Sequence, residues 1–295
     1  MKHAIQTMGA CLARARQTIR SALRRMVSPA LRALVLVCAL ATFTALVFLI
    51  GYILVRGIPN LRPSLFAWEY NSDNVSMLPA ILATLEMTGL SLLICVPLGV
   101  FTAVYLVEYA RRGSRLVKVI RMTAETLAGI PSIVFGLFGM LFFVTFLHWN
   151  YSVLAGAMTL SIMVLPSVMR TTEEAMIAVP DAYREASFGL GAGRLRTVFR
   201  VVLPSAMPGI LAGVILAVGR IVGETAALIY TAGTVAQIPG SIFDSARTLA
   251  VHMYSLSREG LHTGEAYATA VVLLVVVLLI NGLSALIARK WTKGK

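Results

Sequence analysis

Two pairs of charged residues lie in or beside long apolar stretches of the sequence: Arg170 with Glu173, and Arg220 with Glu224. A charged group in the middle of a bilayer costs about 2.5–3.5 kcal/mol on insertion scales, so it should have a partner or a purpose. Side chains three or four residues apart share a helix face, so each arginine is expected to pair with its glutamate. A guanidinium binds phosphate-like oxyanions through a planar fork of donors. The chemistry indicated is the passage of an anion, with each carboxylate weakening the hold of its arginine.

A structural interpretation of these residues stays open beside the functional one. Both pairs could be ion pairs that only stabilise the protein, and Arg170 could reach the membrane surface along its aliphatic stem. Glu86 is a second possible partner for Arg220 if the helices that carry them meet.

The elements that position these residues follow from composition. The chain has 295 residues, of which 58% are hydrophobic and 13% charged, whereas soluble domains carry about 25% charged residues. Crossing a bilayer takes about 20 apolar helical residues. Six stretches are long enough: 31–55, 78–107, 127–147, 151–169, 206–229 and 266–288. We therefore predict an all-α, polytopic membrane protein with six transmembrane helices, the third of them broken near Pro131.

The charges predict the orientation. With the N-terminus in the cytoplasm, most of the 26 Lys and Arg residues fall on the cytoplasmic side. The exceptions outside are Arg56, Arg62, Arg247 and Arg258. This asymmetry follows the positive-inside rule, so both termini are expected in the cytoplasm. The net charge of +13 is thus explained by topology, and nucleic acid is excluded as a partner.

Between the fourth and fifth stretches, residues 181–204 are polar, basic and rich in glycine. Asp181–Phe188 is expected to form a short helix, because proline before it and an acidic first residue favour a helix start. Glycines at 189, 191 and 193 should end that helix. A second short helix, Leu195–Val202, is expected to stop at Pro204.

This segment resembles the cytoplasmic coupling loop of ABC importer permeases, whose motif reads E-A-A, three residues, G, nine residues, then I-x-L-P. The matching residues here are Glu185, Ala186, Ser187, Gly191, Val201, Leu203 and Pro204. Ser187 and Val201 depart from the motif conservatively. The resemblance implies that the loop docks on an ATPase subunit through Arg184, Glu185, Ala186 and Gly191.

Further pieces resemble the A-type permease subunits of phosphate-specific ABC importers. They are Pro131-Ser132-Ile133-Val134 with Gly136, Arg170-Thr171-Thr172-Glu173, and Arg220-x-x-Gly223-Glu224-Thr225. The resemblance covers about residues 78–290. It implies the MetI-like permease fold in a bacterial inner membrane and a phosphate path along Arg220, Arg170, Glu173 and Glu224.

The same resemblance implies the partners. They are a homologous C-type permease subunit in a heterodimer, two ATPase subunits, a periplasmic phosphate-binding protein and membrane lipid. The alternative is a permease for another oxyanion: sulfate, molybdate or phosphonate.

Enzyme functions find no support in the motifs. There is no H-E-x-x-H helix and no G-x-x-x-x-G-K-[ST] loop, so ATP hydrolysis is expected in separate subunits, and neither a metal nor a cofactor is expected. His252 and His262 are interpreted as solvated loop residues. The domain boundaries predicted are a basic segment 1–30, a retained first helix 31–55, and a permease core 78–290 that contains the coupling loop. The basic segment is either an amphipathic helix on anionic lipid or a tail that only fixes orientation.

Overall fold

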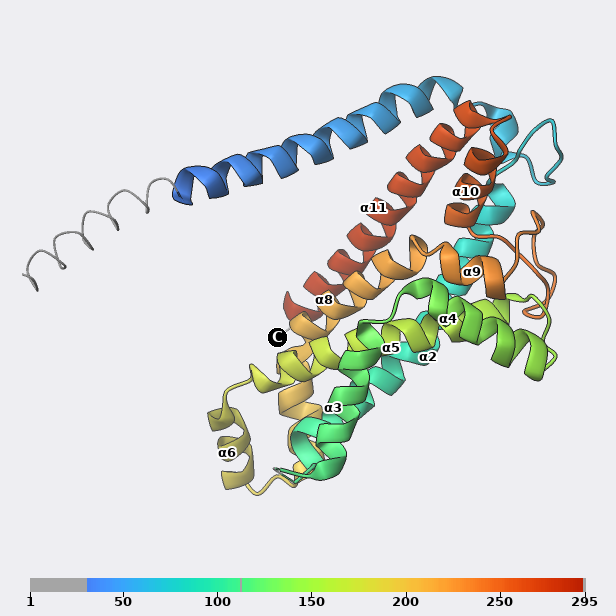
Figure 1. Ribbon diagram of the computed structural model, residues 1–295. Coiled ribbons are helices and arrows are strands. Elements are labelled where there is room, and N and C mark those ends of the chain that lie inside the picture. The colour runs from blue at the N-terminus through green and yellow to red at the C-terminus, as the bar shows by residue number, and fades with distance from the viewer. Residues whose placement is uncertain (1–30, 112, 294–295) are drawn as a thin grey trace, which may run out of the picture. The chain divides into compact units, whose positions relative to one another are not determined.

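The structure is a computed structural model that describes residues 31–111 and 113–293, and the predicted basic segment 1–30 lies outside them. Throughout the described residues, every regular element is a helix, which confirms the all-α class (Figure 1). The chain divides into two units, residues 1–55 and 56–295. Within the first unit, residues 31–55 form one continuous helix with a largely exposed apolar surface.

Among the residues that the structure describes, five helices are long and apolar enough to cross a membrane. They are Leu31–Asn60, Leu78–Tyr109, Val153–Ile177, Arg194–Val222 and Thr263–Leu286. A sixth candidate consists of two helical pieces, Arg115–Ala128 and Ser132–Phe146, which are bent by 102°. The predicted number of six spans is met when this bent pair counts as one span.

The bend lies where the sequence predicted a break. Helix α3 (Arg115–Ala128) ends at Gly129, and α4 (Ser132–Gly139) begins directly after Pro131. Proline has no backbone N–H and disfavours helical geometry in the residue before it, so a helix ends here readily. The third predicted stretch, 127–147, is therefore mostly α4 with its extension η4 (Met140–Phe146), and α3 turns away from it.

The fifth span differs from the prediction at both ends. Before it, α7 (Arg194–Thr197) and the π-helical turn η5 (Val198–Val202) lead without interruption into α8 (Leu203–Val222), so Pro204 does not stop a helix. The wide turn shifts the backbone hydrogen bonds just where proline lacks a donor. At the other end α8 stops at Gly223, and α9 (Ala226–Thr231) is a separate helix.

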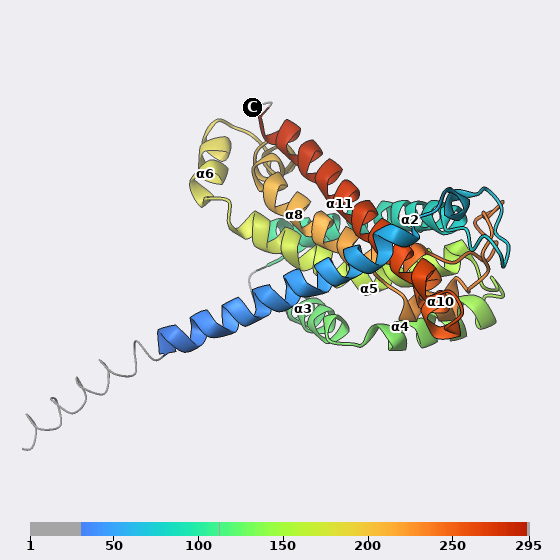
Figure 2. The same cartoon turned by 90° about the horizontal axis from the view of Figure 1, so that it is seen from above.

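The centre of the second unit is α5 (Val153–Ile177), which packs against α2 (Leu78–Val104) and α8 (Figures 1 and 2). Two thirds of its apolar window is buried, against one third for α2 and for α8, so α5 is the most enclosed span. Ser91 Oγ donates to the carbonyl of Ala157 at 3.2 Å and links α2 to α5. Such close packing of small residues is typical of helices in membranes.

The remaining elements complete this unit. The short turns η1 (Ile58–Asn60) and η2 (Pro63–Phe66) precede α2, and η3 (Tyr105–Tyr109) follows it. Between α5 and α7 lies α6 (Asp181–Gly189). The last two helices are α10 (Leu249–Glu259) and α11 (Thr263–Lys293), which lie side by side.

Candidate functional site

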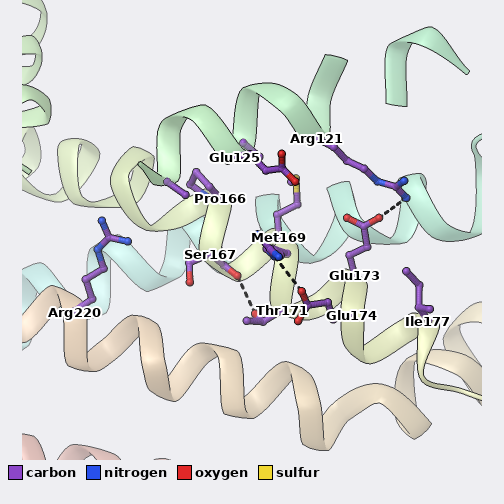
Figure 3. Close-up of a pocket in the computed structure, with 13 residues that line it drawn as sticks. Arg121, Glu125, Pro166, Ser167, Met169, Thr171, Glu173, Glu174, Ile177 and Arg220 are labelled. Atoms are coloured by element: carbon purple, nitrogen blue, oxygen red, sulfur yellow. Dashed lines mark hydrogen bonds and ion pairs between the residues drawn. The ribbon is translucent and has the colours of Figure 1, made fainter. Parts of the chain in front are cut away.

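A cavity of about 450 Å³ lies between α3, α5 and the last turn of α8 (Figure 3). Each helix contributes one arginine to its lining: Arg121, Arg170 and Arg220. The carboxylates in the lining are Glu125, Glu173 and Glu174. Three of the four residues predicted for the substrate path therefore meet at one cavity, and Glu224 does not line it.

Ion pairs around this cavity differ from those predicted. Arg170 Nε donates to Glu174 Oε1 at 3.0 Å, one helical turn along α5, and not to Glu173. Glu173 points toward α3 and forms an ion pair with Arg121 (Figure 3). The expected pairing of Arg170 with Glu173 is thus wrong, because the nearer cation for Glu173 comes from another helix.

The expected pairing of Arg220 with Glu224 is wrong as well. The i,i+4 geometry requires an unbroken helix, and α8 ends at Val222. Glu224 Oε1 instead accepts a hydrogen bond of 3.1 Å from the backbone N–H of Ala227 and caps the start of α9. Glu86, the other partner considered, is exposed on α2 and does not line the cavity.

Arg220 is consequently the uncompensated cation of this cavity. Among the side chains that the structure describes, none forms an ion pair or hydrogen bond with its guanidinium. Figure 3 shows it across the cavity from the Arg121–Glu173 pair. A guanidinium carries a fork of N–H donors that suits a tetrahedral oxyanion. The cavity can therefore receive an anion at Arg220 while the other arginines are held by carboxylates.

Arg121 and Glu125 were not among the predicted site residues, since both lie between the stretches 78–107 and 127–147 that were predicted to cross the membrane. Both lie on α3, four residues apart and so on one helix face. Their spacing was a usable signal, but only the 102° bend after α3 brings that face beside α5.

The segment 181–204 has the predicted first helix and glycine turn. Helix α6 spans Asp181–Gly189, and Gly191 adopts φ +80°, a left-handed conformation that side chains with a Cβ rarely adopt. Glu185 and Ala186 are exposed on α6, and Leu190 in the turn is 90% exposed. The tip of the turn therefore leaves an apolar side chain uncovered.

Arg184, by contrast, is fixed within the chain. Its Nε donates to Glu108 Oε1 at 3.0 Å, and its two terminal nitrogens donate to the carbonyls of Val179 (2.8 Å) and Met176 (2.9 Å). The side chains of Arg184 and Glu108 are only 13% and 7% exposed. Arg184 therefore ties α6 to the ends of α5 and η3.

His252 is fully buried on α10, so its interpretation as a solvated loop residue is wrong. Burial, reinforced by the nearby positive charge of Arg247, lowers the pKa of His252 to about 3. His262 is partly exposed, with Nδ1 3.9 Å from Glu265 Oε2. Within the described residues, no group of three or more His, Cys, Asp or Glu side chains could hold a metal ion.

Known proteins resemble this chain in sequence. The family described as binding-protein-dependent transport system inner membrane component matches residues 95–293. The probable ABC transporter permease protein YqgI of Bacillus subtilis is 35% identical, covering 86% of this chain and 90% of that protein. The phosphate transport system permease protein PstA 2 of Mycobacterium tuberculosis is 32% identical, with 92% of both chains covered. PstA of Pasteurella multocida is 34% identical over 78% of this chain and 82% of that protein.

Solved structures resemble it in fold. A bacterial ABC transporter involved in the import of alginate matches with a TM-score of 0.63 at 16% identity, over 85% of this chain and 92% of that chain. The MetNI methionine ABC transporter in an inward-facing conformation matches with a TM-score of 0.56 at 21% identity, over 73% and 94%.

Proposed function

The chain belongs to the family of inner membrane components of binding-protein-dependent transport systems, and we propose that it is the A-type permease subunit of an ATP-driven importer of inorganic phosphate. As a member of this family it is a multi-pass inner membrane protein and a transport component, not an enzyme. Permeases of ABC importers assemble with ATPase subunits and a periplasmic binding protein.

The observation that carries the proposal is the uncompensated guanidinium of Arg220 in the cavity between α3, α5 and α8. A phosphate that reaches this point can accept two parallel hydrogen bonds from Arg220. Arg121 and Arg170 add positive charge, and their glutamates moderate it. Transport needs this moderation, because an anion held too tightly would not leave the path.

A second candidate is a permease for sulfate, molybdate or phosphonate. A guanidinium can donate hydrogen bonds to any tetrahedral oxyanion of suitable size, so the cavity alone does not distinguish these substrates. Phosphate is favoured because relatives that align with this chain over most of its length are named phosphate transport permeases.

Coupling to ATP is the second part of the proposal. α6 and the turn at Gly191 dock on an ATPase subunit in the cytoplasm, with Glu185, Ala186 and Leu190 on the contact surface. Arg184 supports that surface from within the chain and passes its movement to η3 through Glu108. A homologous C-type permease forms the other half of the path, and both termini lie in the cytoplasm.

The test is uptake of radiolabelled phosphate by cells in which the complex is the sole phosphate importer. Unlabelled phosphate should compete with uptake, whereas sulfate, molybdate and phosphonate should not. If one of these other oxyanions competed better than phosphate, that oxyanion would be the substrate. The docking proposal is tested separately by cross-linking a cysteine at residue 185 to the ATPase subunit.

A further inference from the structure

Arg220 lines a second pocket besides the cavity between α3, α5 and α8. This pocket has a volume of about 530 Å³ and lies between α5, α8 and α11. Its polar side chains are Ser167, Arg220 and Asn281. Ser167 and Arg220 line both spaces, so the guanidinium can be approached from either one.

Asn281 is an unusual residue in its helix. It follows the uninterrupted apolar run 271–280. Its amide oxygen is buried and has no hydrogen-bond partner among the described residues. Leaving a buried acceptor unsatisfied costs about 1–3 kcal/mol, so an amide at this place should have a partner for at least part of its working cycle.

The two unsatisfied groups in this pocket are chemically complementary. Asn281 has an acceptor without a donor, and Arg220 has donors without an acceptor. An amide oxygen can orient a guanidinium without cancelling its charge, which a carboxylate would do. Such a neutral partner suits an arginine that must remain attractive to an anion.

We propose that Asn281 is a positioning residue for Arg220 in the substrate path. In one state of the working cycle, the amide oxygen accepts a hydrogen bond from the guanidinium and holds it toward the junction of the two spaces. When an oxyanion arrives, Arg220 turns its fork to the anion, and the amide N–H₂ of Asn281 donates to an anion oxygen. This inference rests on the proposed function, because it concerns how the same path holds phosphate.

A packing role for Asn281 between α8 and α11 makes the opposite prediction about two substitutions. Aspartate has nearly the shape of asparagine, and Arg220 in the same pocket can compensate its charge, so a packing role tolerates Asn281→Asp better than Asn281→Leu. Positioning of Arg220 reverses this order, since an aspartate would pair with Arg220, neutralise it and repel phosphate. A charge-assisted hydrogen bond is stronger than a neutral one, so the arginine would be held in place.

The experiment measures the initial rate of radiolabelled phosphate uptake by the complete transporter, with the amount of assembled complex determined by co-purification. Asn281→Asp should reduce uptake by about tenfold or more, and Asn281→Leu by about three- to tenfold. Ser284→Ala, a polar-to-apolar change one turn further along α11 and outside the pocket lining, is the matched control and should retain full uptake.

The outcomes separate this inference from the proposed function. If Arg220→Gln loses uptake while Asn281→Asp equals Ser284→Ala, the positioning role is overturned and the phosphate path stands. It is equally overturned if Asn281→Leu is more damaging than Asn281→Asp. If the unaltered transporter imports another oxyanion in place of phosphate, the proposed function fails, and the order of the variants measured with that anion still decides the role of Asn281.

Discussion

Arg184 lies on α6 within the segment 181–204, Arg220 lies on α8 after it, and their surroundings are opposite. Arg184 directs its nitrogens at two backbone carbonyls and a buried carboxylate, all within this chain. Arg220 faces two open spaces and has no ionic partner among the described side chains. A guanidinium whose donors are all used holds helices together, whereas one with free donors is available to a ligand. The same residue type is therefore bound by its own chain at position 184 and open to a ligand at position 220.

The largest effect is expected when Arg184 loses its buried partner, Glu108. Glu108→Leu removes the buried carboxylate and leaves Arg184 with only the exposed Asp181 as an ionic partner, so the loss should approach the cost of a broken buried pair, about 3–5 kcal/mol. The purified transporter should unfold at a lower temperature, and α6 should be cleaved faster by protease. Glu259→Leu, at the exposed end of α10, is the control and should change neither measurement. Unaltered thermal unfolding of Glu108→Leu would show that the pair contributes little.

Substitution of Arg220 should leave stability intact and remove transport. Arg220→Gln loses a charge-assisted contact worth about 1.5–3 kcal/mol, so phosphate uptake should fall by about ten- to a hundredfold. Arg220→Lys keeps the charge but loses the fork, and should retain more uptake than Arg220→Gln. Arg258→Gln, an exposed arginine of α10, is the control.

Exchanging the charges of Arg220 and Glu224 tests whether Arg220 serves only as an ion-pair partner. If Arg220 only formed an ion pair with Glu224, the double variant Arg220→Glu with Glu224→Arg would restore uptake. Since Glu224 caps α9 and the helix between the two residues is broken, the swap should fail. Rescue by the swap would return Arg220 to a structural role.

The contrast between the two arginines also shows which features the sequence could predict. The helix start at Asp181, the glycine turn and the break at Pro131 depend on neighbouring residues, and all three were predicted correctly. Hydropathy likewise located the apolar spans, because it sums over many residues.

Ion-pair partners could not be predicted in the same way. Glu173 pairs across helices with Arg121, and that contact depends on how α3 turns after its bend. The end of α8 at Gly223 was hidden because apolar residues continue on both sides of it, so Arg220 and Glu224 were assigned to one helix face. Spacing alone gives correct partners only where the helix is known to be continuous.

A smaller effect is expected from a substitution at Gly191, in the turn that follows α6. Gly191→Ala places a Cβ at φ +80°, which costs about 1–2 kcal/mol, although no neighbouring atom obstructs it. Because Arg184 still anchors α6, the protein should remain inserted, while ATP hydrolysis loses its coupling to uptake. The measurement is phosphate imported per ATP hydrolysed in proteoliposomes. Gly189→Ala, with an equally open site but no left-handed backbone, is the matched control, and equal ratios in the two variants would contradict this role of the turn.

The smallest effect is expected from substitution of Glu174, which forms an exposed ion pair with Arg170. The Arg170–Glu174 pair is 3.0 Å long, but both side chains are nearly two thirds exposed. Such a pair contributes about 0.2–1 kcal/mol, so Glu174→Gln should change thermal stability little and phosphate uptake by less than about threefold. Glu173→Gln is the matched comparison on the same helix: its carboxylate is only 10% exposed and holds Arg121, so its loss should cost more of both. If Glu174→Gln proved the more damaging of the two, exposure would be a poor guide to the arginines of this cavity, and Arg170 would join Arg220 as a principal anion contact.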